Sequence, residues 1–173
     1  MPKIIPNIRE QLLNETRKQI EEKGYAATTM RSVSGACGFA VGTMYNYFDS
    51  KERLVSTFVY EDLIKYFEYM EQLPKESPEV VFHGIFTSLK EFMENHRKLF
   101  SDPDAAKAMR PDFETRRKFF RDRIGNVILP LCEERKVDNP VIVSRFIAEA
   151  LVSMAMDNVD FEIAYSLVIK LII

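Results

Sequence analysis

The chain contains 173 residues, of which 46% are hydrophobic and 29% charged, and its net charge is −2. This composition is ordinary for a soluble protein, and the length allows one sizeable core or a small head with a larger body. Two cysteines, Cys37 and Cys132, are too few for a disulfide framework, which favours a reducing compartment. No apolar run approaches the ~20 residues that span a bilayer, and residues 1–8 do not resemble a signal peptide. We therefore expect a cytoplasmic protein with no membrane partner.

The charges are distributed unevenly along the chain. Residues 1–54 contain eight Lys and Arg against six Asp and Glu, whereas residues 55–173 contain sixteen against twenty. The N-terminal part is therefore weakly basic and the remainder acidic. This asymmetry suits a protein that presents one end to a polyanion.

The first predicted helix covers residues 7–23. Asn7 and Glu10 have the spacing of a capping box at its start. Four residues at helical spacing would face inward: Leu12, Leu13, Thr16 and Ile20. Gly24 is expected to end this helix, and Tyr25 to pack back over its last turn.

Two short helices joined by a glycine turn are predicted next. Thr29 can cap the first, because its hydroxyl can accept a hydrogen bond from an unpaired backbone amide. Gly38 stands where a residue tolerant of positive φ is needed, so the turn covers residues 37–39 and the second helix residues 40–48. In the second helix, Val41, Met44, Tyr45 and Phe48 are available for inward packing and Thr43, Asn46 and Tyr47 face outward, with Tyr45 near the edge of the two faces. This layout is typical of a helix-turn-helix that reads nucleic acid.

Gly42 and Lys51 each allow two interpretations. Gly42 costs its helix about 1 kcal/mol relative to alanine, and it either admits a DNA backbone or relieves crowding between helices. Lys51 lies in the first turn of a third helix, capped by Asp49 or Ser50, where the helix dipole disfavours a cation. A nearby phosphate would make this lysine favourable, and the alternative is a solvated surface lysine.

Three sequence runs at a fixed spacing identify a known family. They are TTMR at residues 28–31, GFAVGTMYNYF at residues 38–48 and SKERL at residues 50–54. Together they closely resemble the DNA-binding segment of the tetracycline-repressor (TetR/AcrR) family of bacterial transcriptional regulators. The resemblance covers about fifty residues at the N-terminus. With the exposed positions above, it gives these candidate DNA contacts: Thr29, Arg31, Val41, Gly42, Thr43, Tyr45, Tyr47 and Lys51.

Two positions depart from the family pattern. Ala40 stands where the family commonly has a serine that caps the recognition helix, and alanine there is expected to cost about 0.5–2 kcal/mol. Gly35 lies inside the preceding helix and weakens it by about 1 kcal/mol. Neither change removes a group that would contact bases. We therefore expect the two changes to affect the rigidity of these two helices and not their assignment.

The remainder of the chain reads as further helices without a motif. Residues 52–73 form a long predicted helix, and a second one, apolar on two sides, begins at Pro78 and ends near Glu94 or His96. A short helix should follow Asp102. The last three predicted helices begin near residue 111, at Asn139 and after Asp160. Pro130 is expected to bend or end the first of these three.

We therefore predict an all-α fold of about nine helices. A three-helix helix-turn-helix head would occupy residues 1–50, and a helical effector-binding and dimerisation domain residues 51–173. The tail at residues 167–173 is apolar on nearly every side, so it needs a second copy of the chain or complete packing within its own body. The resemblance implies a four-helix interface made by the last two helices of each copy. Candidate interface residues are Phe146, Ala150, Phe161, Ala164, Val168 and Leu171.

Phenylalanines and methionines are frequent in the predicted body. The resemblance to the family implies that some of them line a cavity for a small apolar or amphipathic effector. Packing in the hydrophobic core explains each of these residues equally well. Candidate ligand contacts are Phe67, Met70, Phe86, Met93, Phe120 and Met154. A basic cluster at residues 116–123 is either a second nucleic-acid patch or a solvated face, and the second interpretation is favoured because Glu114 and Asp122 dilute the charge.

The sequence gives no support for catalysis. The two histidines, His83 and His96, lack cysteine or carboxylate partners at metal-ligand spacing, and no phosphate loop or nucleophile motif is present. We expect no cofactor and no metal. The leading hypothesis is a dimeric, ligand-responsive regulator, most simply a repressor, that binds a palindromic double-stranded operator and is released by the effector. The alternative is a helical module that binds a small molecule or protein and has lost DNA reading.

Overall fold

The computed structural model of the chain describes residues 7–109 and 113–173. Within these ranges it consists of ten α-helices and one short 3-10 turn, with no β-strand. The predicted all-α class is therefore confirmed. None of the described helices is both long and apolar enough to cross a membrane.

The described residues divide into two compact units. One unit comprises residues 7–62 and 96–109, and the other comprises residues 63–95 and 113–173. Helix α4, Lys51–Glu71, contributes residues to both units. The expected functional boundary at residue 50 stays a prediction, because these units follow packing alone.

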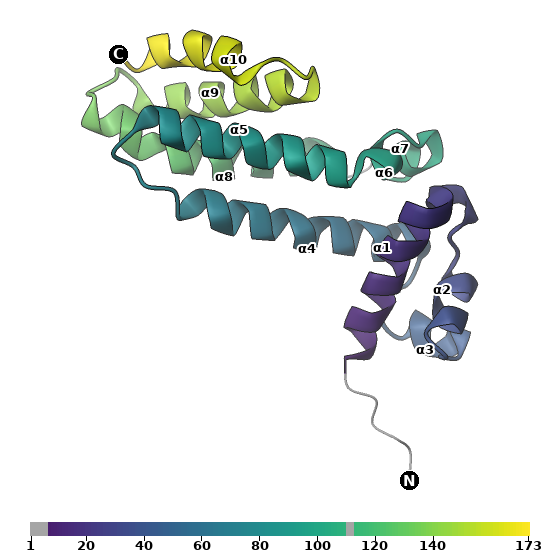
Figure 1. Cartoon of the computed structure of the whole chain (residues 1–173). Coiled ribbons are helices and arrows are strands. Elements are labelled where there is room, and N and C mark those ends of the chain that lie inside the picture. Colours follow the sequence, from purple (N-terminus) through teal and green to yellow (C-terminus); the bar gives the residue numbers. More distant parts are fainter. Residues whose placement is uncertain (1–6, 110–112) are drawn as a thin grey trace. The chain divides into compact units, whose positions relative to one another are not determined.

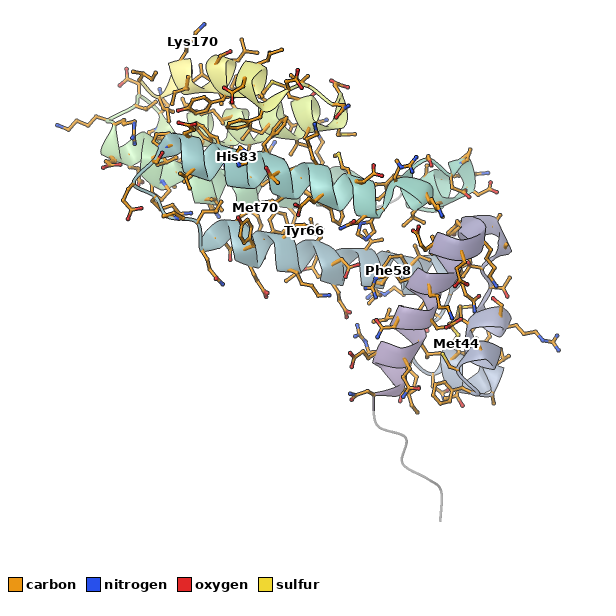
Figure 2. All side chains as sticks on the ribbon, in the orientation of Figure 1. Met44, Phe58, Tyr66, Met70, His83 and Lys170 are labelled. Atoms are coloured by element: carbon orange, nitrogen blue, oxygen red, sulfur yellow. The ribbon has the colours of Figure 1, made fainter. Side chains whose placement is uncertain are left out.

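The first unit is built from α1 (Ile8–Ala27), α2 (Met30–Ala36), α3 (Val41–Tyr45), the first part of α4, α6 (Arg97–Phe100) and α7 (Pro103–Met109). Helix α1 packs against α2, α6 and α7, and α2 packs against α3, as Figure 1 shows for α1, α2 and α3. Buried side chains from all of these helices form its core, and Met44 in Figure 2 is one of them. The core includes Leu12, Leu13, Ile20, Met30, Val33, Met44, Phe48, Leu54 and Phe58.

The two ends of α1 differ in how well they were predicted. Asn7 adopts a left-handed conformation with φ of 61° and makes no side-chain capping bond, so the predicted capping box is wrong. Gly24 interrupts the helical geometry with φ of 83°, as expected of a helix-stopping glycine. Tyr25 is buried directly after it, and its carbonyl accepts a hydrogen bond from the Thr28 amide at 3.2 Å.

The second unit is a bundle of α5 (Pro78–Asn95), α8 (Phe113–Glu134), α9 (Pro140–Met156) and α10 (Phe161–Val168), with the second part of α4. These four helices lie side by side in Figure 1, and a 3-10 turn over Ile169–Leu171 ends the chain. Helix α5 is buried on most of its circumference, as predicted for a helix apolar on two sides. Its buried residues are Val81, Phe82, Gly84, Ile85, Phe86, Ser88, Leu89 and Phe92.

Two features of the second half concern where helices end. Pro130 was expected to bend or end its helix, and α8 continues past it to Glu134, so of these two effects the end does not occur. Ile128, Leu131 and Cys132 around the proline are completely buried, and this packing holds the helical path although one backbone donor is missing. The short helix α6 was not anticipated. The expected start of α8 at Pro111 and Asp112 lies outside the described residues.

Candidate nucleic-acid interface

Helix α2 begins with a reciprocal cap. The Thr29 hydroxyl accepts a hydrogen bond from the Ser32 amide at 3.0 Å, and the Ser32 hydroxyl oxygen accepts one from the Thr29 amide at 3.0 Å. The Ser32 hydroxyl also lies 2.6 Å from the side-chain oxygen of Gln19 on α1, which ties α2 to α1. The predicted cap at Thr29 is confirmed. Its hydroxyl oxygen is thereby engaged in holding the start of α2, whereas Arg31 is exposed.

The turn after α2 has the hydrogen bonds of a glycine stop. Gly38 adopts φ of 73°, its amide donates to the carbonyl of Gly35 at 3.1 Å, and the Phe39 amide donates to the carbonyl of Ser34 at 2.8 Å. These are the two bonds of a Schellman motif, in which a left-handed residue closes the helix end. The predicted turn at residues 37–39 is confirmed, and it sets the direction in which α3 leaves α2.

Helix α3 is shorter than the predicted 40–48 and covers only Val41–Tyr45. Ala40 makes no side-chain capping bond, as its methyl group dictates. Met44 and Phe48 are buried and anchor the segment. Tyr45, which was expected near the edge of the inward and outward faces, is 51% exposed and so lies on the outward side.

The outward side of α3 and the turn after it form a polar, exposed surface. Tyr47 is 45% exposed, Asn46 and Gly42 are exposed, and Thr43 and Val41 are partly exposed. Hydroxyl, amide and phenol groups of this kind donate to phosphates and to base edges. The side that was predicted to face a major groove is therefore free of the chain's own core.

Gly42 has open space around it. A Cβ atom built at Gly42 would meet nothing within 4 Å, and the same holds for Gly35 on α2. The interpretation that Gly42 relieves crowding between helices is therefore wrong. Because the Gly42 backbone is open to the outside, the remaining interpretation is that a DNA backbone approaches the chain at this glycine.

Lys51 is engaged with α1. Its ammonium donates to the carbonyl of Tyr25 at 2.7 Å and lies 3.6 Å from the centre of the Tyr25 ring. The Tyr25 hydroxyl in turn donates to Glu52 at 3.4 Å. Burial lowers the pKa of Lys51, and burial followed by the charge of Glu52 raises the pKa of Tyr25 to about 12. One of the three ammonium donors is thus used within the chain, so the lysine is more than a solvated surface residue.

Ser50 caps the start of α4. Its hydroxyl oxygen accepts a hydrogen bond from the Arg53 amide at 3.1 Å, which selects Ser50 over Asp49 as the capping residue. The backbone amide of Glu52 and the Ser50 hydroxyl both lower the pKa of the Glu52 carboxyl. The helix start beside Tyr25 is therefore held by two side chains, and Lys51 projects from it in a fixed direction.

A partly buried polar cluster in the first unit was missed by sequence reasoning. Arg17 donates to Asp62 through two nitrogens, at 3.1 and 2.8 Å, and His96 Nε2 lies 3.3 Å from Asp62 Oδ2. The His96 ring is buried and stacks with Phe58 and Phe100, at 6.1 and 5.7 Å between ring centres. These contacts join α1, α4 and the start of α6. No spacing rule indicates them, because Arg17, Asp62 and His96 are separated by more than thirty positions each.

The candidate ligand residues lie in the second unit, and only some of them meet. Phe67 and Phe120 are 5.5 Å apart between ring centres, whereas Phe86 contacts Phe161 at 5.9 Å. Phe67, Met70 and Phe86 are buried, and Met93, Phe120 and Met154 are partly exposed. Their role in binding an effector stays a prediction.

The candidate dimer residues occupy two different environments. Phe146 and Leu171 are exposed, and Ala150 and Phe161 are partly exposed. Ala164 and Val168, by contrast, are buried within the second unit. Their exposed neighbours on α10, Ile163 and Leu167, carry the apolar surface that would meet a partner.

Residues 12–57 match the family model described as "Bacterial regulatory proteins, tetR family". The regulator UidR of Escherichia coli strain K12 is 32% identical over 54 residues, which cover 31% of this chain and 28% of UidR. The repressor KstR2 of Mycolicibacterium smegmatis is 30% identical over 118 residues, covering 64% of this chain and 58% of KstR2. The chain thus spans between about a quarter and three fifths of the length of these curated relatives.

The fold is shared over nearly the whole chain with solved structures. The structure of a SmeT–triclosan complex superposes with a TM-score of 0.63 at 17% identity, covering 94% of this chain and 90% of that one. The similarity in sequence is strongest in the helix-turn-helix, and the similarity in fold extends through the second unit.

Proposed function

We propose that the chain is a DNA-binding transcriptional regulator of the TetR family that acts as a repressor. One observation carries the proposal. The segment from Val41 to Tyr47 is anchored by the buried Met44 and leaves a continuous polar surface exposed. A surface of this kind, supported by two capped helices, fits the major groove of a duplex.

The proposed contacts differ in what they do. Thr43, with Val41 beside it, would meet base edges, including a thymine methyl group. Tyr45, Tyr47 and Lys51 would contact phosphates, and Gly42 would let the DNA backbone approach. Thr29 acts through the start of α2, where it fixes the cap, and Arg31 adds a cation next to it.

We further propose that the regulator works as a homodimer on a palindromic operator in the cytoplasm. Ile163 and Leu167 on α10 are each 54% exposed, and Phe146 on α9 is also exposed. A two-fold copy would cover these apolar side chains. Two heads about 34–36 Å apart would then reach successive major grooves on one side of the duplex.

Release from DNA would follow binding of a small apolar or amphipathic effector in the second unit. The structural neighbour SmeT is described in complex with triclosan, and the aromatic residues Phe67 and Phe120 meet inside the second unit. Helix α4 contains Phe67 and also begins at Lys51. A ligand that repacks Phe67 therefore acts on the same helix that carries a proposed DNA contact.

The test is a fluorescence anisotropy titration with duplex fragments from the DNA that flanks the chain's own gene. One fragment should bind with strong salt dependence, and footprinting should reveal two half-sites. Tyr45→Phe should weaken binding to every duplex alike by about tenfold, because one hydrogen bond to a charged phosphate is lost. Tyr69→Phe, the same change at an exposed tyrosine of the second unit, is the matched control and should have no effect.

One observation favours a second candidate function. Helix α3 has only five residues and lacks a side-chain cap at Ala40, so its rigidity is low for a recognition helix. A chain that has lost DNA reading would instead be a helical module that binds a small molecule or a protein. Absence of binding to all flanking fragments, together with normal folding, would favour this function and contradict the first.

A further inference from the structure

Tyr25 contacts the ammonium of Lys51 with both its carbonyl and its ring. The carbonyl oxygen accepts a hydrogen bond from Lys51 Nζ at 2.7 Å, and the ring centre lies 3.6 Å from the same nitrogen. A cation at this distance over an aromatic face is attracted by the ring electrons. The ammonium is thus held from two directions by a residue that lies 26 positions away in the sequence.

The contact also offsets the unfavourable position of the lysine on its own helix. Lys51 is the first residue of α4, where the helix dipole disfavours a cation. Gly24 interrupts α1 with φ of 83° near its C-terminal end, and the next carbonyl along the chain meets the lysine. Carbonyl oxygens give the C-terminal end of a helix a negative partial charge, which attracts a cation. The end of α1 therefore stabilises a charge that the start of α4 disfavours.

Tyr25 is itself fixed by contacts within the first unit. The residue is only 4% exposed, and its hydroxyl donates to Glu52 Oε1 at 3.4 Å. Its carbonyl also accepts a hydrogen bond from the Thr28 amide at 3.2 Å, so one oxygen serves both Thr28 and Lys51. A ring and a carbonyl held in this way form a preorganised support for the lysine.

The contact with Tyr25 leaves part of the ammonium for an external anion. A lysine ammonium carries three N–H donors, and the Tyr25 carbonyl takes one of them. Lys51 is half-buried, so its nitrogen is not enclosed by the protein. Burial lowers the pKa of this lysine, and the charges of Glu52, Asp102 and Asp104 act against that change. A phosphate would therefore meet an ammonium whose direction is set before the DNA arrives.

We propose that Tyr25 is a positioning residue for DNA binding, and that the Lys51 ammonium stays on its carbonyl and ring while the remaining donors contact a phosphate. This inference rests on the proposed function, because it concerns how the Lys51 contact is made. A lysine on an unsupported stem loses side-chain entropy when it binds, and Tyr25 removes much of that cost beforehand. If Lys51 instead left Tyr25 to reach the phosphate, Tyr25 would compete with DNA and weaken binding.

Anisotropy titration of the operator fragment at several salt concentrations tests the proposal in a double-mutant cycle. Tyr25→Leu should weaken binding about fivefold, and Tyr25→Phe should restore it to within about twofold, because phenylalanine keeps the ring and the carbonyl. Lys51→Met should lower the slope of log affinity against log salt by about 0.9 for each head. In the Lys51→Met background, Tyr25→Leu should cause no further loss, because no ammonium is left to position.

Phe58→Leu, at another buried aromatic residue of the first unit, is the matched control. It should lower the free energy of unfolding, as Tyr25→Leu does, but leave operator affinity and salt slope unchanged. Circular dichroism should show that every variant is folded at the temperature of the titration. An equal loss from Tyr25→Leu with and without Lys51, or tighter binding by Tyr25→Leu, would overturn the proposal.

Nuclear magnetic resonance of the unmodified chain, labelled with ¹³C-lysine, gives a readout that needs no folded Tyr25 variant. The Tyr25 ring should shift the Lys51 ε-methylene signal upfield, and Lys51→Met identifies that signal by removing it. The shift should persist in the operator complex, and its loss on DNA binding would overturn the proposal. If the unmodified chain bound no duplex, the proposed function would fail and this inference with it, even where the free chain showed the shift.

Discussion

Gly42 and Gly35 lie in short neighbouring helices, and neither is crowded by the surrounding protein. Substitution by alanine should therefore raise the free energy of unfolding by up to about 1 kcal/mol at either position, because alanine is the better helix former. Only Gly42 lies on the surface proposed to meet DNA. Gly42→Ala should weaken operator binding at least tenfold, and Gly35→Ala should leave it unchanged.

Chemical denaturation and anisotropy titration of both variants measure the two effects separately. If Gly42→Ala bound the operator as tightly as the unmodified chain, the proposed approach of the DNA backbone at this glycine would be wrong. A loss of stability in either variant would instead contradict the open surroundings of the two glycines.

Tyr25 makes the stability of the first unit sensitive to high pH. Burial and the nearby Glu52 raise its pKa from 10.0 to about 12 in the folded chain. The folded state therefore holds the phenol proton more tightly than the unfolded state, which stabilises the fold fully below pH 10. This contribution, on the order of 2–3 kcal/mol, should be lost as the pH rises from 10 to 12.

Urea denaturation of the unmodified chain and of Tyr25→Phe between pH 8 and 12 measures this effect. Phenylalanine keeps the ring beneath Lys51 and removes the proton. The free energy of unfolding should fall more steeply with pH in the unmodified chain than in the variant. Burial lowers the pKa of Lys51, but this lysine is present in both proteins, so the difference between the curves reports on Tyr25. Parallel curves would contradict the raised pKa.

At the scale of elements, the contact of Arg17 with Asp62 joins α1 to α4. Asp62→Ala would remove the carboxylate that Arg17 and His96 share, and His96 is buried there. We expect a loss of about 1–3 kcal/mol, below the value for a fully buried pair because Arg17 is partly exposed. Glu61→Ala on the same helix breaks only the exposed pair with Arg9 and should cost less than about 1 kcal/mol.

Thermal unfolding of both variants gives the comparison. Equal effects at the two neighbouring positions would show that the Asp62 cluster adds no more than a surface ion pair. Protection of α1 amides from hydrogen exchange provides a second readout, and it should fall in Asp62→Ala alone.

Two local signals in the helix-turn-helix were predicted well, although the local capping box at Asn7 was not, and a feature that depends on distant contacts was missed. The cap at Thr29 and the stop at Gly38 follow from hydrogen bonds made within a few residues, so the sequence contains all the information they need. The continuation of α8 through Pro130 depends on burial against other helices. Local propensity alone favours the wrong result there.

The same distinction applies to the candidate site. Its position followed from three sequence runs and its outward residues from helical spacing, whereas the early end of α3 at Tyr45, in place of the expected residue 48, was not predicted. The contact of Lys51 with the Tyr25 carbonyl spans 26 positions. No periodicity connects residues so far apart, and only the folded chain brings them together.

For the molecule as a whole, the exposed apolar side chains of α10 predict self-association. Leu167→Glu would place a charge in the proposed interface, where burial without a partner is unfavourable. We expect a monomeric protein of normal helical content whose operator affinity falls at least a hundredfold, because two linked heads bind more tightly than one. Tyr69→Glu introduces the same charge at an exposed site on α4 and should remain dimeric.

Analytical ultracentrifugation over a wide concentration range distinguishes the two variants. If Leu167→Glu remained a dimer, the proposal that α10 forms the interface would be wrong. A protein that is monomeric without any substitution would contradict both the dimer and the spacing of the two heads.

The first unit is assembled from two separate stretches of chain. Leu99 and Ala105, from α6 and α7, are buried in it, and Lys98 forms an ion pair with Glu21 of α1 at 3.2 Å. During synthesis, the residues proposed to touch DNA therefore leave the ribosome well before the helices that complete their support. At 5–20 residues per second, roughly 2–10 s separate the emergence of residue 62 from that of residue 109. A nascent chain in that interval would expose the side of α1 that α6 and α7 later cover. We expect chaperones to bind this exposed side of α1 mainly during that interval.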